Sequence, residues 1–148
     1  SFIHLQIIRI WFKLGLMDKL LKEEGLKVTR ARLQVLDILS KEKYPIDMEN
    51  IFHKIKKKGV NLATLYRIMF LFEEKSLVQK VDLKKGMAFF ELKQKHHHHI
   101  ICKQCDKIED FENKEIEKIL KNISRNSLKF KKITDHSLEL FGLCKVCS

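Results

Sequence analysis

Two pairs of cysteines constrain this chain more than any other feature of its sequence. In each pair two residues separate the cysteines, and the pairs, Cys102 with Cys105 and Cys144 with Cys147, contain all four cysteines. This spacing lets two thiolates of one tight turn bind the same ion, so two such turns can supply four tetrahedral ligands. Two disulfides or a redox motif are the alternatives, but no other feature indicates secretion. We therefore expect one structural zinc site.

Four consecutive histidines, residues 96–99, precede the first cysteine pair. An expression tag is the alternative interpretation, but tags usually lie at a terminus and are longer. Side chains alternate in an extended segment, so His96 and His98 would face one side and His97 and His99 the other. We expect this segment to supply ligands to two separate metal sites.

The positive charge of the chain is concentrated in its first part. The whole chain has 148 residues and a net charge of +11. Residues 1–95 contain 20 Lys and Arg against 11 Asp and Glu, whereas residues 96–148 contain 10 against 8. This asymmetry favours a polyanion-binding part joined to a sensor part. An AT-biased genome that encodes many lysines would also raise the charge, so composition alone is weak evidence for nucleic-acid binding.

The first residues are apolar, but Gln6, Arg9 and Lys13 interrupt them. We therefore do not expect residues 2–16 to span a membrane, and they lack the features of a signal peptide. We predict that Met17 is the native start and that residues 1–16 are an upstream extension. The alternative is an amphipathic helix that packs on a partner subunit. We expect a cytoplasmic protein without a membrane partner.

Apolar periodicity predicts four helices in the first part of the chain. The first begins near Asp18 and ends at Gly25, and Thr29, Asp47 and Asn61 are predicted N-caps of the next three. Two strands follow at residues 77–81 and 88–92, with a basic turn between them. Helices followed by a hairpin in this order predict a winged helix-turn-helix.

The second part of the chain predicts a small α/β domain. We expect a strand at 107–111, a helix at 114–124 and a strand at 131–140. A unit of this size cannot cover both sheet faces with its own residues. We therefore expect zinc binding and self-association to stabilise it. The predicted organisation is α+β: an extension at 1–16, a winged-helix domain at 17–92, a hinge at 93–95, and a dimerisation and metal-binding domain at 96–148.

Several motifs, taken in order, resemble the ferric uptake regulator (Fur) family. They are Gly25-Leu26-Lys27-Val28-Thr29 with Arg32, Leu62-Ala63-Thr64-Leu65-Tyr66-Arg67, Phe90-Glu91-Leu92, the histidine run, Asp135-His136-Ser137 and the two cysteine pairs. The resemblance extends from about residue 18 to the end. It implies a homodimeric, metal-activated transcriptional repressor, not an enzyme, that binds palindromic double-stranded operator DNA and controls metal-uptake genes.

The resemblance also implies which residues meet DNA. They are Lys27 in an AT-rich minor groove, Arg32 on a phosphate, and Thr64, Tyr66 and Arg67 on the recognition helix. A tyrosine ring can pack on a thymine methyl, and a narrow minor groove attracts a lysine. The alternative for Tyr66 is a core aromatic of the helix.

Two regulatory metal sites are implied as well. One matches His96, His98, Glu117 and His136. The other matches Glu91, His97 and His99 but is incomplete, because the family's fourth ligand aligns with Pro45, so water, Asp82 or His4 would have to complete it.

The regulatory metal is expected to be zinc or iron(II), with manganese(II) a further candidate. Iron regulators generally have Asp where His98 stands, and more nitrogen ligands favour zinc. Glu91, in contrast, is typical of iron regulators. We place zinc slightly ahead of iron(II).

Three other functions compete with this interpretation. A peroxide sensor of the same family would lose DNA when a histidine ligand is oxidised. A zinc-storage protein would bind no specific operator. A zinc hydrolase is disfavoured, because a four-cysteine site is closed and no His-Glu-x-x-His motif is present.

Overall fold

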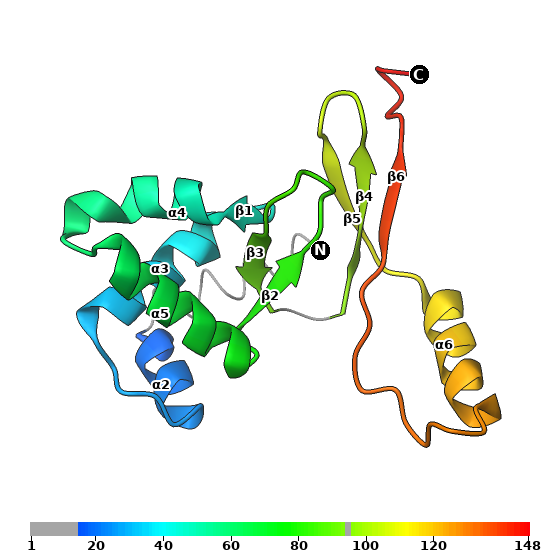
Figure 1. The fold of residues 1–148 in the computed structure, drawn as a ribbon, viewed down its shortest axis with the longest axis horizontal. Helices are drawn as coiled ribbons and strands as arrows, with labels where there is room; N and C mark the ends of the chain where they lie inside the picture. The colour runs from blue at the N-terminus through cyan, green and yellow to red at the C-terminus, as the bar shows by residue number, and fades with distance from the viewer. Residues whose placement is uncertain (1–14, 94–95) are drawn as a thin grey trace. The chain divides into compact units, whose positions relative to one another are not determined.

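The computed structural model describes residues 15–93 and 96–148. The chain divides into two compact units, Ser1–Gln94 and Lys95–Ser148 (Figure 1). Most of the predicted extension at 1–16, the alternative ligand His4 and two of the three predicted hinge residues lie outside the described residues. Among the described residues, no helix is both long enough and apolar enough to cross a membrane.

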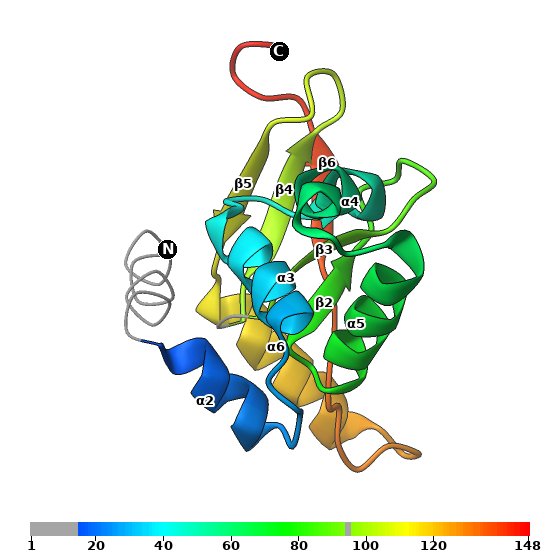
Figure 2. The same ribbon diagram turned by 90° about the vertical axis from the view of Figure 1, so that its left-hand side faces the viewer.

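The first unit contains the predicted helices (Figure 2). They are α2 (Leu16–Glu23), α3 (Arg30–Lys41), α4 (Met48–Ile55) and α5 (Leu62–Glu74), and a short 3-10 helix that was not predicted, η1 (Lys56–Lys58), follows α4. At the ends of α2 and η1, Gly25 and Gly59 adopt φ values of 71° and 82°, in the left-handed region that glycine tolerates best.

The three predicted N-caps are confirmed. Thr29 Oγ1 accepts a hydrogen bond from the Arg32 N–H at 3.3 Å at the start of α3. Asp47 Oδ1 accepts from Asn50 at 2.9 Å in α4, and Asn61 Oδ1 accepts from Thr64 at 2.8 Å in α5. Each bond satisfies an amide that the helix itself leaves unpaired, and this fixes where the helix begins.

A three-stranded antiparallel sheet completes the first unit. Its strands are β1 (Ile46–Asp47), β2 (Val78–Val81) and β3 (Phe89–Leu92), in the order β1-β3-β2. The hairpin β2–β3 forms where the sequence predicted it, whereas the short β1 is an addition after Pro45. One core joins the helices to the sheet, and fully buried side chains include Leu36, Ile51, Leu65, Phe72 and Val78. This is a winged helix-turn-helix, with α4 and α5 as its helix pair.

The second unit is a small α/β domain. It contains β4 (His98–Cys102), β5 (Ile108–Phe111), α6 (Lys114–Asn126) and β6 (Glu139–Gly142). The sheet order is β5-β4-β6, with β4 antiparallel to β5 and parallel to β6. The α+β class with a winged helix followed by a small α/β unit is therefore as predicted.

The predicted strand at 131–140 is wrong in extent. Residues 131–138 form no strand, and β6 begins at Glu139 and continues to Gly142. Alternating apolar residues do not fix where a strand pairs. The register along β4 does so here, with His99 opposite Glu139 and Cys102 opposite Gly142.

Candidate metal and DNA-binding sites

The two cysteine pairs meet at one end of the second sheet. β4 ends at Cys102 and its parallel partner β6 ends at Gly142, so both cysteine turns leave the sheet at the same place. Asp106 N–H donates to the Cys102 carbonyl at 3.0 Å, and Cys147 N–H donates to the Cys144 carbonyl at 3.0 Å. The four Sγ atoms lie within 4.8 Å of one another.

The spacing of the thiols fits a tetrahedral zinc ion. With Zn–S bonds of about 2.3 Å, a tetrahedron separates its sulfurs by about 3.8 Å. The Cys105 and Cys144 Sγ atoms are 3.7 Å apart. These four residues could therefore hold the ion without a large rearrangement.

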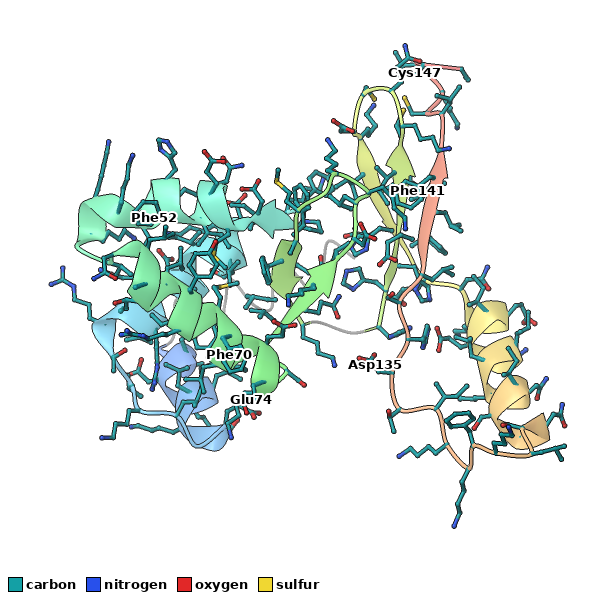
Figure 3. All side chains as sticks on the ribbon, in the orientation of Figure 1. Phe52, Phe70, Glu74, Asp135, Phe141 and Cys147 are labelled. Atoms are coloured by element: carbon teal, nitrogen blue, oxygen red, sulfur yellow. The ribbon has the colours of Figure 1, made fainter. Side chains whose placement is uncertain are left out.

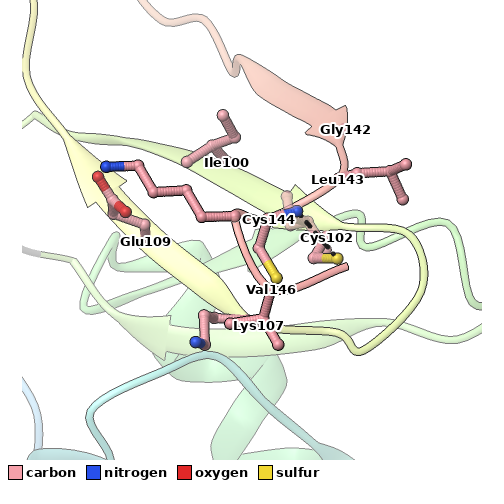
Figure 4. Close-up of a pocket in the computed structure, with 10 residues that line it drawn as sticks. Ile100, Cys102, Lys107, Glu109, Gly142, Leu143, Cys144 and Val146 are labelled. Carbon is pink, nitrogen blue, oxygen red and sulfur yellow. Dashed lines mark hydrogen bonds between the residues drawn. The ribbon is translucent and has the colours of Figure 1, made fainter. Parts of the chain in front are cut away.

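Backbone amides favour the thiolate of Cys102. Cys144 N–H donates to Cys102 Sγ at 3.3 Å (Figure 4). This bond, with N–H groups of Cys105 and Gln104, lowers the pKa of Cys102 to about 6. Hydrogen bonds and charge from the other thiols raise the pKa of Cys147 to about 12. Without a cation, the cluster therefore favours ionisation of Cys102 and disfavours that of Cys147.

A cavity of about 360 Å³ lies beside the cysteine turns. Its lining is mostly apolar with a few charged side chains, and includes Ile100, Lys107, Glu109, Leu143 and Val146 (Figure 4). Its wall also contains Cys102 and Cys144, so it is part of the cysteine site rather than a separate one.

A second cluster brings three imidazoles to the carboxylate of Glu117. Glu117 Oε1 lies 3.2 Å from the Nε2 atoms of His96 and His98 and 3.5 Å from that of His136. The Nε2 atoms of His96 and His136 are 2.6 Å apart, so one imidazole donates and the other accepts. These are the four residues that the family resemblance implied, and their ligand atoms lie within 4.8 Å of one another.

Three different elements hold this cluster. His98 is on β4, His136 is on the segment before β6, and Glu117 is on the first turn of α6, which Asn113 caps by accepting from the Glu115 and Ile116 amides. Burial lowers the pKa of His98, and the nearby His96 and His136 lower it further. A neutral imidazole is the form that binds metal.

Burial by itself would raise the pKa of Glu117. The His98 hydrogen bond and the charges of the neighbouring histidines outweigh burial, so the net shift is downward. The carboxylate is thus ionised in the form that a divalent cation needs.

The remaining predicted metal ligands are distributed over both units. In the second unit, the His97 and His99 rings have centroids 4.9 Å apart, and His99 is 2% exposed. Glu91 lies on β3 of the first unit, where its Oε1 accepts from Gln79 Nε2 at 2.6 Å. The predicted grouping of Glu91 with these histidines spans the two units and stays a prediction.

Sequence reasoning missed one acidic neighbour of this histidine pair. Asp110 is opposite His99 across β4 and β5, with its Oδ1 3.7 Å from His99 Nε2. The alternative ligand Asp82 instead accepts from the Lys84 amide at 2.8 Å within the first unit. Asp110 could have been found from the sequence only by aligning strand 107–111 with the histidine strand.

The predicted DNA-binding residues lie on α5 and around the start of α3. Tyr66 is 54% exposed, so its ring is not a core aromatic, and Arg67 is exposed beside it. Thr64 is half-buried at the start of α5. Lys27 is exposed, and its carbonyl accepts a hydrogen bond from Arg32 Nη1 at 2.7 Å. One N–H group of the Arg32 guanidinium is therefore already used in a hydrogen bond within the chain.

The family assignment rests on most of the chain. The sequence model of the Ferric uptake regulator family matches residues 23–141, a range that includes most of each unit and ends before the second cysteine pair. The chain belongs to the Fur family. As a member it is a metal-binding, DNA-binding regulator of transcription.

Individual relatives agree with the Fur assignment. The ferric uptake regulation protein of Legionella pneumophila is 36% identical over 131 residues, covering 86% of this chain and 95% of the relative. The Pseudomonas aeruginosa ferric uptake regulator, solved with manganese, has a TM-score of 0.71 and 30% identity, covering 86% and 97%. The Helicobacter pylori Fur, described with three functional metal-binding sites, has a TM-score of 0.70 and 28% identity, covering 97% and 93%.

Proposed function

We propose that this Fur-family chain is a metal-dependent transcriptional repressor. In this proposal it binds palindromic operator DNA as a homodimer in the cytoplasm, and it controls metal-uptake genes. The observation that carries the proposal is the convergence of His96, His98 and His136 on Glu117. Those four side chains come from three separate segments of the chain, so ligand binding there can stabilise one arrangement of the unit over another.

The four cysteines are proposed to hold structural zinc. A four-thiolate site is coordinatively closed, so it suits a structural ion rather than a catalytic or exchanging one. The second unit has few buried apolar side chains, and none of the residues of α6 is buried. Zinc binding would therefore contribute a large part of the folding free energy of this unit.

The regulatory ion is proposed to bind the histidine and glutamate cluster. The relatives are named for ferric uptake, and one solved relative contains manganese, which supports iron(II) with manganese(II) as a substitute. We therefore propose iron(II) first, although the ligand types alone led us to expect zinc slightly ahead of it. A zinc-responsive regulator is the second candidate, because three imidazoles and one carboxylate form a nitrogen-rich set that suits four-coordinate zinc.

A further regulatory site is proposed at the other histidine pair. His97, His99 and Glu91 are its expected ligands, and Asp110 is the group we add in place of the missing fourth ligand. The 3.7 Å separation between His99 Nε2 and Asp110 Oδ1 supports this addition. A carboxylate here would make the site richer in oxygen than the Glu117 cluster, which favours iron(II) over zinc.

Self-association is proposed to occur through the second unit. Large apolar side chains there are exposed, among them Ile119 at 58%, Ile123 at 53% and Phe130 at 69%. Exposed apolar surface of this extent on so small a unit indicates an interface. A two-fold dimer would place two recognition helices on successive major grooves, roughly 34 Å apart.

Metal-buffered DNA binding tests the proposal. Operator sequences are selected from a random duplex pool, and binding is then measured at buffered free iron(II), manganese(II) and zinc. We expect the protein to bind the selected operator only when metal is present. Operator binding should reach saturation as the free iron(II) concentration rises. Sequence-specific binding without added metal, or no sequence selection at all, would refute the proposed function.

The same titration separates the two candidate metals. His98→Asp introduces the oxygen ligand that iron regulators generally have at this position. The substitution should lower zinc affinity at the Glu117 cluster, while the zinc bound by the cysteines should remain. If zinc alone drives operator binding and His98→Asp abolishes that response, the zinc-responsive candidate is correct. If peroxide with iron(II) releases DNA through histidine oxidation, the chain is a peroxide sensor of the family.

A further inference from the structure

Phe70 is the most exposed aromatic side chain on α5. It is 70% exposed (Figure 3). The buried face of the same helix already contains Leu65, Ile68, Met69 and Phe72. The core of the first unit therefore does not use Phe70. Leaving a phenyl ring in water is unfavourable, so a ligand that covers this ring gains free energy.

The position of Phe70 on the helix indicates the side from which such a ligand would approach. Successive residues of an α-helix turn by about 100°, so Phe70 lies about 40° from Tyr66 and about 60° from Arg67 around the axis. All three side chains are exposed. Phe70 thus lies on the same face as the two residues expected to meet DNA, one turn further along.

The charge around this face favours DNA as the occupant. Arg67 lies on it, and η1 adds the exposed Lys56, Lys57 and Lys58 before the first turn of α5. The positive end of the helix dipole lies at Leu62, about two turns before Phe70, and the exposed Glu74 lies one turn beyond the ring, so the favourable charge is on the N-terminal side of Phe70. A phosphate backbone complements such a surface, whereas an apolar protein partner would have to bury these cations.

We propose that Phe70 is a specificity-determining residue that packs against a thymine methyl group in the major groove. This inference rests on the proposed function, since it needs α5 to be the recognition helix. Thymine alone presents a methyl group in the major groove, and apolar side chains, including phenylalanine, contact it. The ring has only two side-chain torsions, so ordering it costs little entropy.

The geometry also predicts which thymine. Phe70 lies about 6 Å from Tyr66 along the helix axis, because each residue rises by about 1.5 Å. Base pairs rise by roughly 3.4 Å, so the contacted thymine should lie one to two base pairs from the base that Tyr66 meets.

Methyl deletion in the DNA tests this contact directly. The operator is the duplex that the wild-type protein selects from a random pool with manganese(II) present. Each thymine is then replaced in turn by deoxyuridine, which removes only the methyl group, and affinities are measured for wild type and Phe70→Ala. We expect one thymine per half-site at which wild type loses about fourfold in affinity, the equivalent of one methyl group of about 0.8 kcal/mol.

At that thymine, replacement by deoxyuridine should not lower the DNA affinity of Phe70→Ala any further. Phe70→Leu, which keeps an apolar contact, should retain part of the effect. Tyr44→Ala is the matched control, because Tyr44 is an exposed aromatic of the first unit that lies outside α5. It should leave the deoxyuridine profile of the wild type unchanged, whatever it does to overall affinity.

Two results would overturn the inference. One is a deoxyuridine profile that is the same for wild type and Phe70→Ala. The other is a Phe70→Ala protein whose thermal stability or oligomeric state changes, which would make Phe70 a packing or subunit contact. If the wild type selects no operator at all, the failure is that of the proposed function and is recognised before any variant is made.

Discussion

His99 and Asp110 lie directly opposite each other on β4 and β5, with His99 Nε2 3.7 Å from Asp110 Oδ1. An imidazole next to a carboxylate is a common arrangement at metal sites, where the acid either binds the ion or orients the ring. The pair shares no residue with the Glu117 cluster, so its contribution can be measured separately.

Asp110→Asn should weaken one divalent-metal site. We expect an affinity loss of roughly 10- to 100-fold at that site, as for other acids that bind or orient a histidine ligand. Competition with a chromophoric chelator measures it. Glu109→Gln is the matched control, because Glu109 is the next residue of β5 and pairs with Ile100 rather than with a histidine. Equal losses in both variants would mean a general charge effect.

Cys144→Ser should release the structural zinc and unfold the second unit. Three thiolates cannot complete the tetrahedron, and metal binding is coupled to folding in such small units. Zinc content by mass spectrometry and circular dichroism measure the two effects. Ser148→Ala, at the end of the same turn, should change neither. A variant without cysteines that stayed a folded dimer would contradict the assignment.

Asp47→Ala should destabilise α4 by about 1 kcal/mol at neutral pH, because an N-cap acceptor is lost. Amide hydrogen exchange in α4, corrected for intrinsic rates, measures it. Asp47→Asn should keep most of the stability, since asparagine also caps helices.

The contribution of Asp47 should depend on pH. Burial alone would raise the pKa of this carboxyl, but hydrogen bonds from the Asn50 backbone and side chain lower it below its usual 3.8. A lowered pKa means that the folded state favours the carboxylate. The stabilisation is therefore present above pH 3.8 and is lost as the pH falls through the folded-state pKa. The wild type and Asp47→Asn should converge below that value. If the stability difference between wild type and Asp47→Asn instead increased on acidification, the Asp47 carboxylate would not be the cap.

Tyr66→Ala and Lys27→Ala should affect DNA binding in different ways. Removing Tyr66 should reduce discrimination between operator and random DNA by roughly 1–3 kcal/mol, as for loss of a base contact. Removing Lys27 should weaken both kinds of binding and reduce the salt dependence. Fluorescence anisotropy at several salt concentrations separates the two. Unchanged operator preference in Tyr66→Ala would remove this residue from base reading.

Helix starts and ligand types were determined by the sequence alone. Thr29, Asp47 and Asn61 cap helices through bonds to amides three residues away, so neighbouring residues contain all the needed information. The two cysteine pairs are likewise local turns, and their chemistry indicates zinc before any fold is known.

Pairing across the chain was decided only by the tertiary structure. The alternating pattern at 131–140 predicted a strand, yet pairing with β4 begins only at Glu139. The same register brings Cys144 to Cys102 and sets Asp110 opposite His99. Likewise, the exposure of Phe70 follows from which face of α5 the core covers. Local propensity does not specify these relationships, because each depends on the free energy of contacts between residues far apart in the sequence.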